Sequence, residues 1–364
     1  MAAIVEQKDD KIVCAADPHI ATAILDRRQR SPKPFVSIEF FPPKTPEGVQ
    51  SLYEVLEKLN EFEPLYADVT WGAGGSTSDL TLELCKGIKS RGTLTNMHLT
   101  CTNMEVSKID AALEGCKSAG ITNLLALRGD PPAGQAAWTA SDANLTCALD
   151  LVNYIRKKYP DNHFCIGVAG YPEGHPTKMV ALSDPAELAA LSPTERARSS
   201  VETDDTGNKT GVTWVCRDED FREEMVYLKR KVDAGAAFIV TQMFFCADVF
   251  STFVAACRDV GILVPVLPGI MSISTYGGFR RMTKFCKTRV PDDLERQMES
   301  LKDDEAGVKK FGIQFGADLC RTLVKQGVPG LHFYTLNAST VTKAIIEEIR
   351  ETLDVPQLAA VPTA

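Results

Sequence analysis

Polar and charged residues stand at the ends of several short apolar segments, where a protein core usually excludes them. The first is Glu39 in "FVSIEFFPP" (35–43), an alternating apolar run that Pro42 and Pro43 end. A carboxyl group there must reach water, find a partner or keep its proton, and a kept proton would suit acid catalysis. The other residues in such positions are Thr70, His98, Arg128 with Asp130, Tyr171 with His175, Gln242, and Asn337.

These residues suggest a binding cavity for a large polar ligand, although each also has a purely structural interpretation. Glu39 could pair with a buried arginine, and His98 could be a hydrogen-bonded histidine of the core. Arg128 and Asp130 could cap loops. A buried polar group costs roughly 1–3 kcal/mol unless it is hydrogen-bonded, so polar residues on seven of eight segment ends are hard to explain by stability alone.

The segments that carry these residues follow a regular rhythm. Eight of them are short and apolar, as buried parallel strands are, at 35–41, 66–73, 95–101, 123–130, 164–172, 238–245, 262–270 and 331–337. Stretches with helical spacing of apolar residues, such as 47–62 and 105–120, lie between them. This alternation predicts an α/β fold, a single-domain (β/α)8 TIM barrel with its site at the carboxyl ends of the strands. The alternative, an open doubly wound sheet, is weakened because no G-x-G-x-x-G motif follows the first strand.

Glycines and caps predict where the helices end. Gly120, Gly235, Gly261 and Gly327 each stand just before a predicted strand, as glycines after a helix C-cap do. Residues 271–330 predict two or three helices, and 339–353 predict a last helix with Ser339 as its cap.

The rest of the chain divides around the barrel, which we expect to span 35–354. Residues 1–34 form an N-terminal extension, and 355–364 an Ala- and Pro-rich disordered tail. Residues 176–222 show little periodicity, so we expect a mobile insertion after strand five, at about 176–218, followed by a helix at 219–234. Because 183–212 are polar, they should bury little surface and be dispensable for folding.

Composition limits the function classes. The chain has 364 residues and a net charge of −8, which favours neither a nucleic-acid partner nor an anionic membrane. The apolar runs are too short to span a bilayer. Eleven cysteines without a C-x-x-C pair favour reduced thiols and a cytoplasmic protein. The five histidines show no metal-ligand spacing, so no metal site is expected.

Nine of these segments together resemble the methylenetetrahydrofolate reductase family. They are "SIEFFPPK", "VTWGAGGST", "HLTC", "ALRGDPP", "AGYPEGHP", "KRKVDAGA", "TQMFF", "PGI" and "HFYTLN", in the order of that family and over about 35–175 and 217–340. The resemblance implies an FAD-binding (β/α)8 barrel that reduces 5,10-methylenetetrahydrofolate to 5-methyltetrahydrofolate with NADH or NADPH, in a ping-pong cycle through the flavin. It also implies a homo-oligomer.

The resemblance assigns roles residue by residue. Glu39 is the catalytic acid, Asp130 steadies the cation that forms, and Gln242 and Leu336 contact folate together with Glu39. The FAD contacts fall on Thr70, His98, Arg128, Gly129, Asp130, Ala140, Tyr171, His175, Arg230 and Lys231. Cationic groups such as Arg128, Arg230 and Lys231 suit the oxygens of a diphosphate.

The implied chemistry offers a reason for Glu39. Opening the five-membered ring of the folate to a 5-iminium cation needs a proton at nitrogen, and apolar surroundings would raise the pKa of the carboxyl that donates it. General acid catalysis of this kind contributes roughly 10²–10⁴-fold. Asp130, if ionised, would stabilise the cation.

The chain departs from the family pattern in three places. Ala338 stands where many relatives have Arg after "YTLN", and short bacterial members lack the insertion. Eukaryotic members usually continue into a regulatory domain that binds S-adenosylmethionine, so we expect a short member or a catalytic domain without feedback inhibition. Two alternatives remain: a related FAD barrel such as a proline dehydrogenase, and a folate- or flavin-binding module without turnover.

Overall fold

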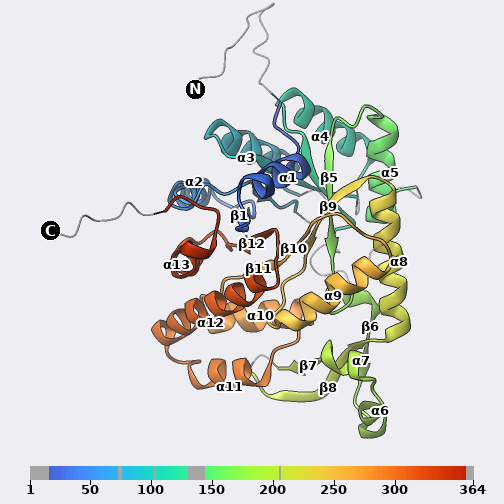
Figure 1. Cartoon of the computed structure of the whole chain (residues 1–364), viewed down its shortest axis with the longest axis vertical. Coiled ribbons are helices and arrows are strands. Elements are labelled where there is room, and N and C mark those ends of the chain that lie inside the picture. The colour runs from blue at the N-terminus through green and yellow to red at the C-terminus, as the bar shows by residue number, and fades with distance from the viewer. Residues whose placement is uncertain (1–15, 73–75, 102–103, 130–143, 205, 358–364) are drawn as a thin grey trace, which may run out of the picture.

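The computed structural model describes residues 16–72, 76–101, 104–129, 144–204 and 206–357, and its centre is a parallel sheet wound into a barrel (Figure 1). The strand order is β10-β9-β5-β4-β3-β2-β1-β12-β11. The strands are β1 (Phe35–Phe40), β2 (Ala67–Val69), β3 (Thr95–Thr100), β4 (Asn123–Leu127), β5 (Cys165–Gly170), β9 (Ala236–Thr241), β10 (Val266–Leu267), β11 (Gly269–Met271) and β12 (Gly330–Tyr334). Each of the eight predicted apolar segments overlaps at least one of these strands, and 262–270 overlaps both β10 and β11, which confirms the TIM-barrel prediction.

The barrel closes through one interrupted strand. β10 pairs with β9 at one edge of the sheet, and β11 pairs with β12 at the other. Only Pro268 separates β10 from β11, so the chain itself joins the two edges. Pro268 cannot donate a hydrogen bond, but its carbonyl accepts one of 3.1 Å from the His332 amide. The predicted strand at 262–270 is therefore this interrupted strand.

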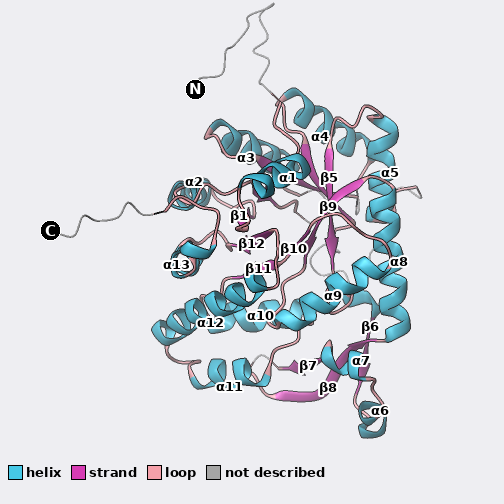
Figure 2. Ribbon diagram, viewed as in Figure 1, coloured by secondary structure: helices cyan, strands magenta, loops and turns pink. Residues whose placement is uncertain are grey.

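Helices surround the barrel on its outside (Figure 2). They are α1 (Ile20–Arg30), α2 (Pro46–Asn60), α3 (Ser78–Ser90), α4 (Val106–Ser118), α5 (Ala148–Lys158), α8 (Asp218–Asp233), α9 (Ala247–Asp259), α10 (Tyr276–Cys286), α11 (Asp292–Ser300), α12 (Glu305–Lys325) and α13 (Thr340–Glu348). The predictions at 47–62, 105–120, 219–234 and 271–330 are confirmed, the last as three helices.

The helix ends show one correct signal and one partial error. The four predicted glycines have positive φ (67°, 113°, 80° and 80°) and follow α4, α8, α9 and α12, where a residue with a Cβ would be strained. Ser339 is the N-cap residue of α13, but its side chain makes no capping hydrogen bond. α13 also ends at Glu348, and a 3-10 turn (Arg350–Thr352) replaces the rest of the predicted helix.

Helix α1 belongs to the barrel rather than to a detached extension. Ile20 and Ile24 are fully buried against barrel side chains that include Phe35 and Phe238. The Ile20 amide donates a 2.8 Å hydrogen bond to Oδ1 of Asn123, at the first residue of β4. α1 therefore covers the amino ends of the strands. At the other terminus, Val355 is buried, so the predicted disordered tail does not begin there.

The insertion is a small ordered unit, contrary to our expectation of a mobile segment. It contains β6 (Met179–Leu182), α6 (Pro185–Ala189), α7 (Pro193–Ala197), β7 (Ser200–Thr203) and β8 (Lys209–Cys216). The strands form an antiparallel sheet in the order β6-β8-β7, which lies beside α11 and below α8 in Figure 1. The polar sequence concealed this unit because three short two-sided strands need few apolar residues.

The insertion also buries more than its polarity suggested. Leu182, Leu191 and Val215 form a small core of their own. The Lys287 ammonium lies 3.4 Å from the ring centroid of Trp214, and Ser200 Oγ donates a 3.0 Å hydrogen bond to a backbone carbonyl at the end of α10. These contacts attach the unit to the barrel helices.

The insertion further supports the start of α8. The N-cap residue of α8 makes no side-chain cap. Instead, Glu195 Oε1 accepts a 3.1 Å hydrogen bond from the Asp218 amide, and Asp218 pairs with the buried Arg198. A carboxylate at a helix N-terminus also interacts favourably with the helix dipole. No helix in the described part of the chain is long and apolar enough to cross a membrane.

Candidate active site

Four side chains meet inside the barrel near the carboxyl ends of β1, β2, β3 and β12. Glu39 lies opposite Asp68 in the register of β1 and β2, and Asp68 lies opposite Asn96 in that of β2 and β3. Alternate residues of a strand point to the same face, so His98 shares the inward side with Asn96. His332 on β12 pairs with Ser37, two residues before Glu39. We call Glu39, Asp68, His98 and His332 the acid–histidine cluster.

The contacts of this cluster form a closed ring. His98 Nε2 lies 3.2 Å from Asp68 Oδ2 and 3.5 Å from Glu39 Oε2. His332 Nε2 lies 3.4 Å from Glu39 Oε2 and 3.7 Å from Asp68 Oδ2. The Glu39 side chain is 16% exposed, whereas those of Asp68 and His332 are fully buried. Glu39 is thus the member that a ligand can reach most easily.

Aromatic and hydroxyl neighbours hold His332 in place. Its Nδ1 lies 3.0 Å from Ser37 Oγ. The ring of Tyr66 stacks on the imidazole at 5.9 Å between centroids, and the ring of Tyr334 meets it edge-on at 5.3 Å. Packing on both sides leaves the imidazole little freedom to rotate, so Nε2 stays directed at the two carboxyl groups.

The electrostatics of the cluster favour a charged His98. Burial alone would lower the pKa of this imidazole, but the hydrogen bond to Asp68 and the negative charges of Glu39 and Asp68 outweigh burial. The net effect raises the pKa of His98 above its ordinary value. A protonated imidazole beside Asp68 offsets part of the cost of burying that acidic side chain.

The cluster corrects our interpretation of Glu39. Its sequence neighbours are apolar, but its spatial neighbours are two imidazoles and a carboxyl group, so the expectation of apolar surroundings is wrong. Sequence reasoning also missed Asp68 and His332. The available signal was strand parity, because both are polar residues at inward positions of apolar strands, in "YADVTW" and "LHFYT".

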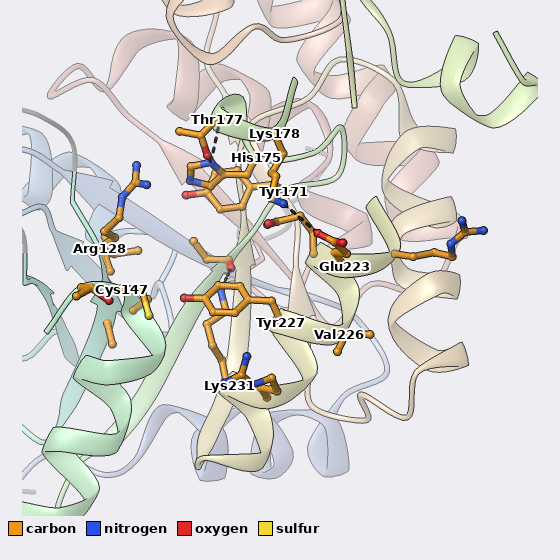
Figure 3. A pocket seen from close by; sticks show the side chains of 18 of the residues that line it. Arg128, Cys147, Tyr171, His175, Thr177, Lys178, Glu223, Val226, Tyr227 and Lys231 are labelled. Carbon is orange, nitrogen blue, oxygen red and sulfur yellow. Dashed lines mark hydrogen bonds and ion pairs between the residues drawn. The ribbon is translucent and has the colours of Figure 1, made fainter. Parts of the chain in front are cut away.

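A second region is a cavity of about 710 Å³ between the ends of β4 and β5 and one side of α8 (Figure 3). Arg128 and Cys147 lie on one side of it, Tyr227 and Lys231 of α8 on another, and Tyr171 and His175 on a third, above Tyr227 in the view. The cations that line it are Arg128, Lys178, Arg222, Arg230 and Lys231, and Glu219, Glu223 and Glu224 also contribute. We call it the cationic cavity.

Burial lowers the pKa of two groups in this cavity, Lys231 and His175. Lys231 is only 5% exposed, and burial lowers the pKa of its ammonium to about 8. Its Nζ donates a 3.1 Å hydrogen bond to the Ala169 carbonyl and lies 5.0 Å from the ring centroid of Tyr227. Burial, followed by the charges of Arg128 and Lys231, lowers the pKa of His175 to about 4. His175 is therefore a neutral imidazole at pH 7.

His175 is oriented by close neighbours. Its ring meets that of Tyr171 edge-on at 4.5 Å between centroids. Its Nδ1 lies 2.7 Å from Thr177 Oγ1 and accepts a 3.2 Å hydrogen bond from the Thr177 amide. Across the cavity mouth, Lys178 Nζ lies 3.0 Å from Glu223 Oε2, so that carboxylate is already paired.

The predicted FAD residues divide between the two regions. Arg128, Tyr171, His175, Arg230 and Lys231 line the cationic cavity together. His98 lies instead in the acid–histidine cluster. Gly129 adjoins Arg128 with a φ of 93°. Thr70 follows β2, and its carbonyl accepts a 3.0 Å hydrogen bond from Thr81 Oγ1. Asp130 and Ala140 lie outside the described residues.

The remaining predicted residues lie at the ends of β9 and β12. The Gln242 amide donates to the Gly170 carbonyl at 2.8 Å, next to the cavity strand β5. Leu336 has a φ of 50° and packs among residues that include Tyr334 and Phe315. Asn337 exchanges two hydrogen bonds with the backbone of Phe41, at 3.0 and 2.7 Å, which indicates a structural role.

Comparisons with known proteins address the family and the fold of this chain. A family model described as methylenetetrahydrofolate reductase matches residues 24–350. "Methylenetetrahydrofolate reductase (NADH) 1" of Arabidopsis thaliana is 46% identical over 302 residues, which are 83% of this chain and 46% of that protein. The chain therefore spans about half the length of that relative. "5,10-methylenetetrahydrofolate reductase" of Escherichia coli is 31% identical over 311 residues, which are 85% of this chain and 88% of that protein.

A solved structure shows the same fold. It is an uncharacterised protein from Clostridium thermocellum that binds two copies of 5-methyl-5,6,7,8-tetrahydrofolic acid. The TM-score is 0.55 at 13% identity, over 91% of this chain and 98% of that one. At this identity the likeness supports the barrel architecture and no assignment of ligand.

Proposed function

The chain belongs to the methylenetetrahydrofolate reductase family, and from this premise we propose that it reduces 5,10-methylenetetrahydrofolate to 5-methyltetrahydrofolate. We propose NADH or NADPH as the electron donor and FAD as the bound cofactor. The observation that carries the proposal is the presence of two separate sites at one barrel: a reachable carboxyl among polar partners, and a cavity lined by cations.

The cationic cavity fits FAD in charge and size. A volume of about 710 Å³ lies within the range of cofactor pockets. Arg128, Arg230 and Lys231 would hold the diphosphate, because bidentate and point-charge donors suit its oxygens. Tyr171 and the neutral His175 offer ring surfaces beside it. When bound, FAD carries a hydride from the nicotinamide to the folate.

Glu39 would supply the proton that the folate step needs. Its carboxyl donates this proton to a ring nitrogen of the substrate, the adjacent carbon–nitrogen bond breaks, and the substrate becomes a 5-iminium cation that can accept a hydride. The carboxylate that remains is stabilised by His98 and His332, whose Nε2 atoms lie 3.5 and 3.4 Å away. Each turnover consumes one hydride and one proton, so Glu39 must be reprotonated from solvent.

The remaining features of the proposal concern partners and compartment. We propose Gln242 and Leu336 as folate contacts, because both follow barrel strands at the same end as Glu39. Asp130 is proposed as the group that stabilises the iminium cation on the strength of the resemblance alone. Buried cysteines such as Cys85, Cys116 and Cys257 are free thiols, which supports a reducing, cytoplasmic compartment. We also propose a homo-oligomer.

A two-step anaerobic assay tests the function. The purified protein should be yellow, and NADH or NADPH should bleach the flavin absorbance. Addition of methylenetetrahydrofolate should then restore the colour with formation of methyltetrahydrofolate. Comparing the bleaching rates with the two nicotinamides identifies the donor. A colourless protein, or a bleached protein that methylenetetrahydrofolate does not recolour, would contradict the proposal.

A further inference from the structure

Three members of the acid–histidine cluster could act as ligands of one metal ion. One ligand atom from each of Glu39, Asp68 and His332 lies within 4.8 Å of the others. We propose that these three residues bind a divalent cation of the Zn²⁺ type. The spacing of histidines along the sequence gave no indication of such a site, because its ligands come from β1, β2 and β12.

The distances in the cluster suit a small transition-metal ion. Nitrogen and oxygen ligands bind Zn²⁺ at about 2.0–2.2 Å, so two ligands at a tetrahedral angle lie about 3.4 Å apart. The distances from His332 Nε2 to Glu39 Oε2 and to Asp68 Oδ2 are 3.4 and 3.7 Å. Small side-chain movements would therefore admit an ion without any change in the barrel.

Ser37 and two aromatic rings orient His332 so that it can act as a ligand. Its Nδ1 lies 3.0 Å from Ser37 Oγ, and an Nδ1–H that donates to this hydroxyl leaves the Nε2 lone pair facing the carboxyl groups. Outer partners of this kind fix the tautomer and orientation of metal-binding histidines. The stacked ring of Tyr66 and the edge of Tyr334 hold the imidazole in that orientation.

Unsatisfied polar atoms of Asp68 and Asn96 give a second observation that points to a ligand here. The Asp68 side chain is fully buried, and its Oδ1 has no hydrogen-bond partner within the described part of the chain. Both polar side-chain atoms of Asn96, its neighbour in register, are also buried without partners there. Among the described residues, Glu39 and Asp68 form ion pairs with His98 and His332 only. No lysine or arginine in that part of the chain neutralises these carboxyl groups.

The ligand types favour Zn²⁺ over the alkaline-earth ions. Imidazole nitrogen suits Zn²⁺, Co²⁺ and Cu²⁺, whereas Mg²⁺ and Ca²⁺ prefer six or more oxygen ligands. The consequence for activity rests on the proposed function. An ion bound to Glu39 Oε2 occupies the oxygen that would carry the proton for folate, so the ion should inhibit the folate step and leave reduction of the flavin by NAD(P)H intact.

Cobalt provides a probe that does not depend on turnover. Co²⁺ should be titrated into the holoenzyme and followed by its visible d–d bands as a difference spectrum against the metal-free protein. We expect one Co²⁺ per chain, displaced by one Zn²⁺. The variants Asp68→Asn and His332→Gln should each weaken Co²⁺ binding by at least about tenfold, the lower end of effects seen for outer-shell partners. Asp161→Asn and His163→Gln, which alter the same residue types outside the cluster, should bind as the wild type does.

The outcomes separate this site from the alternatives. A flavin spectrum and thermal midpoint like those of the wild type show that a variant is folded. If His332→Gln fails to fold, Asp68→Asn still tests the site, because this substitution is nearly isosteric. Absence of d–d bands, binding that the two cluster variants leave unchanged, or intense thiolate-to-cobalt charge-transfer bands would each overturn the proposal. In the two-step assay, Zn²⁺ should slow recolouring by folate but not bleaching. If the protein proves not to turn over folate, the cobalt titration still decides whether the metal site exists.

Discussion

The acid–histidine cluster and the cationic cavity lie at the same barrel but are built in different ways. Every member of the cluster is a strand residue, held by the backbone ladder of β1, β2, β3 and β12 and by contacts with the other members. The cavity instead combines loop residues after β4 and β5 with one side of α8. The position of its wall therefore depends on how α8 is held.

This difference divides the molecule into a rigid and an adjustable part. The hydrogen-bonded ladder fixes the position of each strand residue, and the pleat fixes the face to which its side chain points. α8 begins where the insertion ends, and Glu195 and Arg198 of the insertion contact its first residue, Asp218. Changes in the insertion should therefore alter the cavity and its ligand, whereas a change at Glu39 should alter proton transfer without loss of flavin.

The largest expected effect is that of Glu39→Gln. The amide is nearly isosteric but cannot donate an acidic proton, so recolouring by methylenetetrahydrofolate should slow by at least roughly 100-fold, the low end of general acid effects. Bleaching by NAD(P)H and flavin content should stay near wild type in stopped-flow and absorbance measurements. Glu57→Gln, an exposed residue of α2, is the control. Equal loss in both steps would mean that Glu39 is structural and that the two regions are not separable.

Lys231→Met should have the next largest effect, and on the other region. A hydrogen bond to a charged group contributes about 1.5–3 kcal/mol, so FAD affinity should fall roughly tenfold or more when the ammonium is removed. The folate step, measured at saturating FAD, should be little changed. Lys229→Met on the same helix, where the ammonium pairs with Asp233, should leave affinity unchanged. An unchanged dissociation constant for Lys231→Met would remove this lysine from the cofactor site.

The affinity for FAD should also depend on pH through Lys231. Burial lowers the pKa of this group to about 8, so the ammonium is charged at pH 7 and becomes neutral as the pH rises above 8. Flavin binding should weaken by up to about tenfold per pH unit above that value. Equilibrium titrations of apoprotein at roughly pH 7, 8 and 9, which span the transition, should show this trend in the wild type. Lys231→Met should lack it.

Replacement of residues 183–212 by a short Gly/Ser linker should have a moderate effect. The linker removes the buried Leu191 together with Glu195 and Arg198, which support α8. We expect the thermal midpoint to fall by roughly 5 °C, since about 1–2 kcal/mol shifts the midpoint of a domain this large by a few degrees. FAD affinity should fall with it. An unchanged midpoint and affinity would restore our first expectation that the segment is dispensable.

The smallest expected effect concerns Glu173, between the cavity residues Tyr171 and His175. Burial raises the pKa of this carboxyl to about 8, and its Oε2 accepts a 2.9 Å hydrogen bond from the Arg289 amide. The folded state keeps this proton while the unfolded chain releases it near its ordinary pKa, so folding stability falls as the pH rises toward 8. Glu173→Gln should remove that decline, and its thermal midpoint should exceed that of the wild type by a few degrees at pH 8 but not at acidic pH. Equal midpoints at both pH values would contradict the assignment.

The sequence by itself determined the barrel architecture and pointed to some residues of each region, such as Glu39 in the cluster and Lys231 in the cavity. The apolar segments gave the strands, and Gly120, Gly235, Gly261 and Gly327 marked the helix ends, because local periodicity and backbone conformation are written in neighbouring residues. The motifs around Glu39 and Lys231 indicated proton donation and anion binding. Local patterns did not predict the ordered sheet of the insertion, because the insertion is polar in composition. The stability of this sheet depends on contacts among its own strands and with α8 and α10.

Only the tertiary structure decided which groups surround Glu39. His332 lies 293 positions away in the chain and Asp68 on the next strand, and the closure of the barrel through β12 brings them within contact distance. A side chain's electrostatic environment depends on distances of a few ångströms in space, and strand order rather than sequence order sets those distances. For this reason the sequence predicted a carboxyl in apolar surroundings, whereas the folded barrel places it between two imidazoles.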